Sequence, residues 1–127
     1  MEGFIVPGIG VDVVDVERFR SSLLRTPSMR DRLFVAEELE YADRKVDPVP
    51  SLAARFAARE AVMKSLGLGL GAFGFHEAWV RVLESGAPTL IVTGRARERA
   101  IDRGVIRWNL SITHDGPVAI AMVVASR

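Results

Sequence analysis

The sequence has no cysteine among its 127 residues. This absence excludes a disulfide framework, a thiolate zinc site and a cysteine nucleophile. Long hydrophobic runs are also missing, since no segment approaches the roughly 18 consecutive apolar residues that a membrane-spanning helix needs. The apolar stretch FIVPGIGVDVV is interrupted by proline, glycine and aspartate, and it has neither a basic leader nor a small-residue cleavage site. We interpret it as a strand and not a signal peptide, and we expect a soluble, cytoplasmic protein without a membrane partner.

An excess of charge of either sign is missing as well. Lysine and arginine total 17 against 16 for aspartate and glutamate, which gives a formal net charge of +1. No global field would draw nucleic acid to the chain, so any recognition through basic residues must be local. Hydrophobic residues make up 49% and charged residues 26%, a composition that argues against disorder. With no internal repeat or linker, the length predicts a single domain over residues 1–127.

Hydrophobic patterning predicts the order of helices and strands. Apolar residues alternate over 9–14, which predicts a strand with Asp12 on one face, where Gly8 and Gly10 leave open space. Asp15 then caps a helix with apolar positions at 16, 19 and 23. Later patterns predict a helical run over 32–45, a helix capped by Ser51, strands over 75–84 and 89–93, a helix ended by Gly104, and strands over 107–113 and 118–125 joined by the turn HDGP. Helices between an N-terminal strand and later strand pairs favour an α+β fold, with a mainly antiparallel sheet packed against helices.

The segment RFAAREAVMKSLGLGLG, residues 55–71, combines a helical apolar stripe with several charges. At 100° per residue, Arg59 and Arg55 fall roughly 20° and 60° from the centre of that stripe, inside or beside it. An unpaired buried cation is costly, so we expect a partner for an arginine in this position. Glu60 and Lys64 lie four residues apart on the flank. They form either an ordinary surface ion pair or part of a site for an anion.

Glycines follow this helix at positions 67, 69, 71 and 74. Backbone N–H groups in a glycine loop can approach and bind phosphate, which makes Gly67, Gly69 and Gly71 candidate ligand contacts. A glycine directly after a helix also commonly serves as its C-terminal cap, and the spacing matches neither a P-loop nor a dinucleotide fingerprint. Both interpretations stay open.

Asp12 and Glu60 are the candidate metal ligands. A carboxylate on a glycine-flanked strand and another on a helix offer two hard oxygen ligands to Mg²⁺. Magnesium typically takes one or two protein carboxylates and completes its shell with water and substrate phosphate. The alternative for Asp12 is a carboxylate at an exposed strand end or at a helix cap. Periodicity leaves open whether the two carboxylates meet.

His114 is one of two histidines and begins the predicted HDGP turn. A turn histidine is commonly structural or merely exposed, which is one interpretation. A Ser–His–Asp triad of Ser111, His114 and Asp115 would crowd three groups onto one strand end, without the nucleophile-elbow pattern around the serine. We therefore disfavour the triad.

With these residues in view, the chain resembles the holo-acyl-carrier-protein synthases, the short 4′-phosphopantetheinyl transferases. GIGVDVVDVERF resembles the family's opening motif, with its aspartate and following arginine. RFAAREAVMKSLGLG resembles the signature helix, and LSITHDGPVAIAMVV resembles the closing Ser-x-x-His strand pair. ESGAPTLIVTG looks like the family's turn and second strand. These ordered motifs extend over nearly the whole chain.

The resemblance implies a reaction, the transfer of the phosphopantetheine arm of coenzyme A to a serine of apo-acyl carrier protein or of a carrier domain. Adenosine 3′,5′-bisphosphate is the other product. Asp12 and Glu60 would bind Mg²⁺ beside the diphosphate, and Lys64 would contact the phosphates. The serine nucleophile comes from the partner, and either Glu60 or a magnesium-bound water is the candidate base.

The resemblance also implies how the substrates bind. His114 and Arg55 would help to hold coenzyme A, and the loop from Gly67 to Gly71 would pass close to it. Arg18 would meet an acidic helix of the carrier protein, and Arg25 would extend that basic patch. Relatives of this kind are homotrimers with sites between subunits.

Two positions depart from the family pattern. Arg59 stands where the signature helix usually has lysine, and it keeps the charge with a different geometry. Ala87 stands where the turn usually has lysine, and residues 28–50 match only loosely, through Glu38 and Tyr41. Two alternatives to the transferase remain: a non-catalytic module that binds coenzyme A or a carrier, and another magnesium-dependent enzyme acting on phosphoesters.

Overall fold

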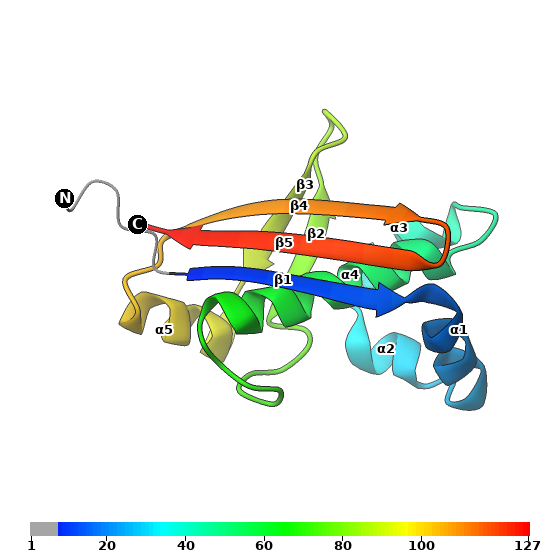
Figure 1. The fold of residues 1–127 in the computed structure, drawn as a ribbon, viewed down its shortest axis with the longest axis horizontal. Helices are drawn as coiled ribbons and strands as arrows, with labels where there is room; N and C mark the ends of the chain where they lie inside the picture. The colour runs from blue at the N-terminus through cyan, green and yellow to red at the C-terminus, as the bar shows by residue number, and fades with distance from the viewer. Residues whose placement is uncertain (1–7) are drawn as a thin grey trace.

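A three-stranded antiparallel sheet with one long helix across it forms the centre of the molecule (Figure 1). The computed structural model describes residues 8–127. The sheet has the order β1 (Gly8–Asp15), β5 (Val118–Ser126) and β4 (Arg107–Asp115), and α4 (Val49–Ser65) packs against it. β2 (Ala78–Val82) and β3 (Pro88–Val92) form a separate antiparallel hairpin. The predicted α+β fold with antiparallel strands packed against helices is confirmed.

The remaining helices gather at the two ends of the sheet (Figure 1). At one end lie α1 (Val16–Arg25), α2 (Met29–Leu33) and α3 (Ala36–Asp43). At the other end α5 (Gly94–Asp102) lies near the C-terminus. Within residues 8–127 none of the helices has the length and apolar character needed to cross a membrane.

Backbone atoms of β1 and α4 lie in direct contact. A Cβ atom added to Gly10 would be 1.9 Å from the carbonyl oxygen of Ala61, and one added to Gly8 would be 1.5 Å from that of Ser65. Only glycine fits at such distances. The prediction of open space beside Gly8 and Gly10 is therefore wrong, because α4 fills it.

Several predicted boundaries also need correction. Ser51 does not cap α4, because the helix begins at Val49 and proline in its first turn needs no N–H partner. The predicted helical run over 32–45 is divided, since the extended backbone of residues 34 and 35 separates α2 from α3. β2 starts at residue 78 and not 75, and β4 continues through residue 115. Residues 4–7 of the first predicted strand region lie outside the described residues.

The sheet face that points away from α4 is apolar and exposed. The strand pleat puts alternate side chains of β1 on this face, and Ile9, Val11 and Val13 are each more than half exposed. Met122 of the central strand β5 pairs with Val11 in the sheet and is 46% exposed. We call these four residues the apolar sheet face. A contiguous exposed apolar surface of this kind is typical of a protein interface.

The contact between β1 and α4 makes a first prediction. Gly10→Ala should lower the free energy of unfolding by at least about 2 kcal/mol, because strand and helix must separate to admit the methyl group. Urea unfolding followed by circular dichroism measures this. Gly69→Ala is the matched control, since nothing lies within 4 Å of a Cβ at that position. Equal stability of the two variants would contradict the packing described here.

Candidate active site

The register between β1 and α4 places Asp12 beside the charged flank of the helix. Gly8 lies against Ser65 and Gly10 against Ala61, so two strand residues correspond to four helix residues. The two spans are about 6.6 Å and 6 Å long, so the correspondence continues along the pair. Asp12 therefore lies level with the helical turn over residues 57–61, which carries Glu60. This is how residues about fifty positions apart in the sequence come together.

Lys64 forms an ion pair with Asp12. Its Nζ donates to Asp12 Oδ1 at 3.0 Å and to the carbonyl oxygen of Val11 at 3.0 Å. The Asp12 side chain is 16% exposed, whereas that of Lys64 is 53% exposed. Among the described residues Lys64 therefore pairs with Asp12, and the surface ion pair with Glu60 that the helical spacing allowed does not form.

Glu60 completes the cluster. Burial raises the pKa of its carboxyl, the charge of Asp12 raises it further, and Lys64 opposes both. The electrostatic influence of Asp12 on Glu60 reflects the approach of two carboxylates in a partly desolvated place. Both line a cleft of about 390 Å³ between β1, α1 and α4. Within the described chain no group of three or more acidic or histidine side chains is placed to hold a metal, and Asp12 and Glu60 are two carboxylates that line one cleft.

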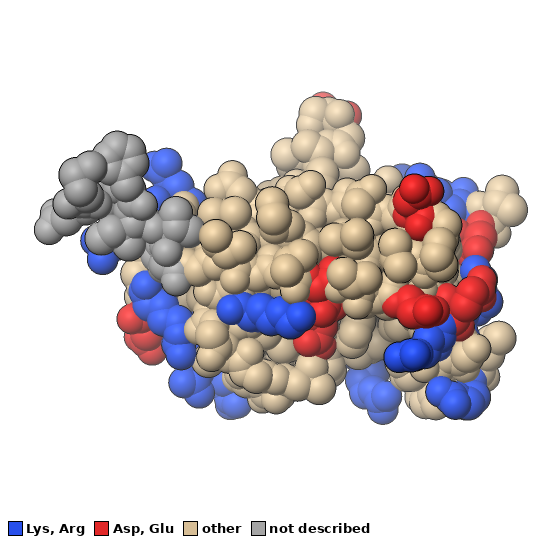
Figure 2. All heavy atoms as spheres, viewed as in Figure 1, with Lys and Arg blue, Asp and Glu red and all other residues tan. Residues whose placement is uncertain are grey.

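The predicted carrier-binding arginines lie on α1. The backbone N–H of Arg18 donates to Asp15 Oδ1 at 2.8 Å, which confirms Asp15 as the N-cap. Arg18 also lines the cleft that contains Asp12 and Glu60. Arg25 is exposed and does not line the cleft, but it lies two turns further along the same face of the helix. Figure 2 shows lysine and arginine side chains at both ends of this view, over α1–α2 and over α5.

Arg55 and His114 lie in a different cavity, of about 460 Å³. Arg55 is only 3% exposed; its Nη1 donates to the carbonyl oxygen of Ser51 at 3.1 Å and to Ser51 Oγ at 2.8 Å. Its guanidinium lies 4.6 Å from the centre of the Tyr41 ring, and its buried Nε has no hydrogen-bond partner in the structure. Burial lowers the pKa of Arg55. A buried cation with a donor to spare is suited to an anionic ligand.

α4 separates this second cavity from the cleft. Arg55 and Glu60 are five residues apart, so their side chains leave the helix roughly 140° apart. Asp12 lies on β1 and His114 on β4, which are the two edges of the sheet. The cleft and the cavity share no lining residue. Within one chain, Asp12, Glu60 and Lys64 come together, whereas Arg55 and His114 form a second group.

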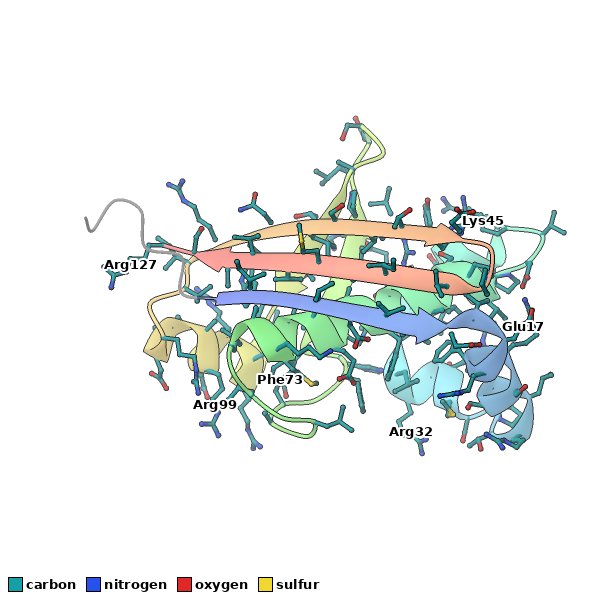
Figure 3. The ribbon with its side chains drawn as sticks, viewed as in Figure 1. Glu17, Arg32, Lys45, Phe73, Arg99 and Arg127 are labelled. Carbon is teal, nitrogen blue, oxygen red and sulfur yellow. The ribbon has the colours of Figure 1, made fainter. Side chains whose placement is uncertain are left out.

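A third hollow, a groove of about 500 Å³, lies beside Lys64 and Gly67 at the C-terminal end of α4. Gly67 has a φ of 68° and follows Leu66, the C-cap residue of α4. It therefore ends the helix, as the C-terminal cap interpretation of the sequence predicted. Gly69 and Gly71 do not line the groove. Figure 3 labels Arg127, which lines this groove, and Lys45, which lines the second cavity, at opposite ends of the sheet.

Ser111, His114 and Asp115 do not form a triad. All three lie in β4, and neighbouring residues of a strand point to opposite faces. Ser111 and His114 are three positions apart, so their side chains project to opposite sides of the sheet. The extension of β4 through residue 115 thus excludes the arrangement that a turn would have allowed.

Arg59 has the partner that its position demands. It is fully buried, and both of its terminal nitrogens donate to the carboxylate of Glu38 on α3. Its Nε donates to the carbonyl oxygen of Phe75 at 2.7 Å, while Glu38 also accepts from the backbone N–H of Val80 at 3.0 Å. The pair therefore ties α3, α4 and β2 together. The apolar stripe indicated that a partner must exist but did not identify Glu38.

Comparisons with known proteins identify the family to which the chain belongs. Residues 8–123 match the model of the 4′-phosphopantetheinyl transferase superfamily. The holo-[acyl-carrier-protein] synthase of Pseudarthrobacter chlorophenolicus is 50% identical over 121 residues, which is 95% of this chain and 98% of that protein. The synthase of Streptomyces avermitilis is 48% identical over 118 residues, 93% of this chain and 95% of its own. The chain belongs to the 4′-phosphopantetheinyl transferase superfamily.

Solved structures place the fold in the same group. The holo-[acyl-carrier-protein] synthase from Neisseria meningitidis superposes with a TM-score of 0.87 at 29% identity, over 97% of this chain and all of that one. The synthase from Helicobacter pylori, solved in complex with coenzyme A, gives a TM-score of 0.81 at 28% identity, over 93% and 99% of the two chains. The protein is therefore an enzyme, a 4′-phosphopantetheinyl transferase.

The buried ion pair makes a second prediction. Glu38→Gln should lower the free energy of unfolding by about 3 kcal/mol, because it leaves the Arg59 cation buried without a counter-charge. The neighbouring Glu37→Gln is the control: Glu37 pairs with Arg81 at the surface, and its loss should cost less than about 1 kcal/mol. Urea denaturation compares the two. If both variants lose the same small amount, Arg59 does not depend on Glu38.

Proposed function

We propose that this protein is a holo-[acyl-carrier-protein] synthase. It transfers the 4′-phosphopantetheine arm of coenzyme A, with Mg²⁺, to a serine of apo-acyl carrier protein and releases adenosine 3′,5′-bisphosphate. The pair of carboxylates Asp12 and Glu60 in a cleft edged by Arg18, with Lys64 bound to Asp12, carries the proposal. The names of the relatives and the coenzyme A complex of the Helicobacter pylori synthase support it.

The residues of the cleft fit the chemistry of the transfer. When bound, Mg²⁺ would supply positive charge to the diphosphate, and Asp12 and Glu60 are the carboxylates to hold it. Lys64 adds a mobile cation for the phosphate oxygens as charge moves onto the leaving group. Either Glu60 or a magnesium-bound water would accept the proton of the carrier's serine.

The second cavity fits the nucleotide end of coenzyme A. Arg55, Lys45 and His114 present groups that bind phosphate, and Arg55 has a donor free for it. Apolar side chains of Val82, Pro88 and Ile112 line the same cavity and offer a surface for a purine ring. Charge and shape thus suit a phosphorylated adenosine.

The separation of cleft and cavity supports active sites between subunits of a homotrimer. One copy supplies Asp12, Glu60 and Lys64, and the adjacent copy supplies Arg55 and His114. The apolar sheet face offers each copy a surface to bury on assembly. A head-to-tail ring of three would then form three equivalent sites.

The carrier protein is the remaining substrate. Arg18 at the edge of the cleft and Arg25 further along α1 suit an acidic helix of a free carrier protein or of a carrier domain in a larger synthase. Loading such a carrier serves fatty-acid or related lipid synthesis. A cytoplasmic location stays a prediction from the sequence.

Mass spectrometry of apo-carrier proteins incubated with the enzyme, coenzyme A and Mg²⁺ tests the proposal. We expect the mass of the phosphopantetheine arm to appear on the carrier, and a chelator to abolish this. Asp12→Asn should lower turnover at least about a hundred-fold, because it removes a charge needed to hold the metal. The surface variant Asp102→Asn should retain full activity.

Failure of every carrier tested, including those of the source organism, would count against the transferase. Coenzyme A binding without transfer and without any effect of Mg²⁺ would favour the non-catalytic module. Release of inorganic phosphate without a carrier would indicate a different phosphoester enzyme.

Shared sites make a further prediction that uses two inactive variants. Asp12→Asn and His114→Ala, co-expressed with different tags and purified through both, should recover roughly a third of wild-type activity, because one site of each mixed ring combines two intact halves. Asp12→Asn mixed with Glu60→Gln is the control and should stay inactive, since both changes affect the same half. Recovery no better than in this control would place the whole site within one chain.

A further inference from the structure

The contact between Lys64 and Asp12 joins two residues that act together in the proposed reaction. We propose that Lys64 occupies the cation position at Asp12 when no metal is bound, and that it leaves Asp12 for the substrate phosphates when metal and coenzyme A bind. The inference rests on the proposed function, because it assigns a second role to a residue of that same site.

The geometry of the contact carries the proposal. Lys64 Nζ donates to Asp12 Oδ1 and to the carbonyl oxygen of Val11, each at 3.0 Å. Mg²⁺ binds a carboxylate oxygen at about 2.0–2.1 Å and also brings bound waters. An ammonium 3.0 Å from that oxygen would be close to a doubly charged ion and would be repelled by it. The lysine and the metal therefore compete for Asp12.

Differences in freedom between the two side chains decide which one moves. Asp12 lies in the middle of β1, where Ala121 of β5 is its sheet partner, and its side chain is 16% exposed. Lys64 is in the last turn of α4, is 53% exposed and has a flexible four-carbon stem. An ammonium has three donors, and two of them have partners here. Lys64 can therefore swing away while the carboxylate stays in place.

The groove at the C-terminal end of α4 gives Lys64 a place to move to. Lys64 also lines the groove that contains Gly67, Arg103 and Arg127. Lys64 thus lies between the groove and Asp12, a residue of the cleft, and its Nζ can serve the carboxylate or an anion in the groove. Before the metal arrives, the lysine offsets the mutual repulsion of the Asp12 and Glu60 carboxylates in the partly buried cleft.

Because of this exchange, the effect of Lys64 on metal binding changes from unfavourable to favourable when coenzyme A binds. Without coenzyme A, Lys64 opposes metal binding because it must first release Asp12. With coenzyme A, the phosphates attract Lys64 and free the carboxylate, so metal and coenzyme A favour each other's binding. A lysine that only contacts phosphate would have no such effect on the metal alone.

The decisive measurement is the affinity for Mn²⁺ alone, without coenzyme A or carrier, from the electron paramagnetic resonance signal of free Mn²⁺. Lys64→Met should bind Mn²⁺ about three- to ten-fold more tightly than the wild type. Lys64→Arg retains the charge and should not gain affinity. Arg103→Met removes a cation from the same groove without a contact to Asp12, and it should stay within about two-fold of the wild type.

Calorimetry without metal should show that Lys64→Met binds coenzyme A more weakly than the wild type, which is the opposite of its effect on the affinity for Mn²⁺. Thermal unfolding should show that Lys64→Met remains folded. The proposal is overturned if Lys64→Met binds Mn²⁺ no more tightly than the wild type, or if Arg103→Met gains as much. A transferase that is active with Mg²⁺ but shows either result keeps its function and loses this role for Lys64. Absence of both Mn²⁺ binding and transfer in the wild type would overturn the proposed function as well.

Discussion

The close backbone contact between β1 and α4 is the constraint on which the rest of the structure depends. Gly8 and Gly10 let carbonyl groups of the helix lie against the strand, and this fixes the register between the two elements. That register brings Asp12 to the helical turn with Glu60 and within reach of Lys64. A larger residue at either glycine would move the helix away from the sheet and the carboxylates away from each other.

A second buried interaction holds the other side of α4. The carboxylate of Glu38 receives hydrogen bonds from Arg59 and from the backbone of β2, so the helix is anchored to elements distant in sequence. An arginine is suited to this role because its guanidinium donates in several fixed directions at once. Arg59 stands where the motif resemblance led us to expect lysine, and in this chain it stabilises the fold from within the core while its neighbour Glu60 faces the cleft.

Local patterns were sufficient to predict the order of the strands, most of the helices, the N-cap at Asp15 and the end of α5 at Gly104, because each depends on neighbouring residues alone. They were also sufficient to show that Arg59 needs a partner. They did not identify Glu38 as the partner of Arg59, and they did not show that α4 begins at Val49 and not after a Ser51 cap. They also did not show that α4 fills the space beside Gly10. The contacts of Glu38 and Gly10 depend on segments that meet only in three dimensions, and no periodicity records such meetings. The start of α4 is a local feature, set by a proline in the first turn, and the Ser51 interpretation overlooked it. The placement of Arg55 and Glu60 in two separate hollows on either side of α4 also depends on the three-dimensional fold.

The position of α4 between the cleft and the cavity has a consequence for how the enzyme would behave at different concentrations. If each reaction centre draws on two copies, catalysis belongs to the ring and not to the chain, and the specific activity becomes a function of subunit association. Dilution would then inactivate the enzyme reversibly by dissociating its subunits, while every chain remained folded. The same helix that organises the core would make solitary copies inert.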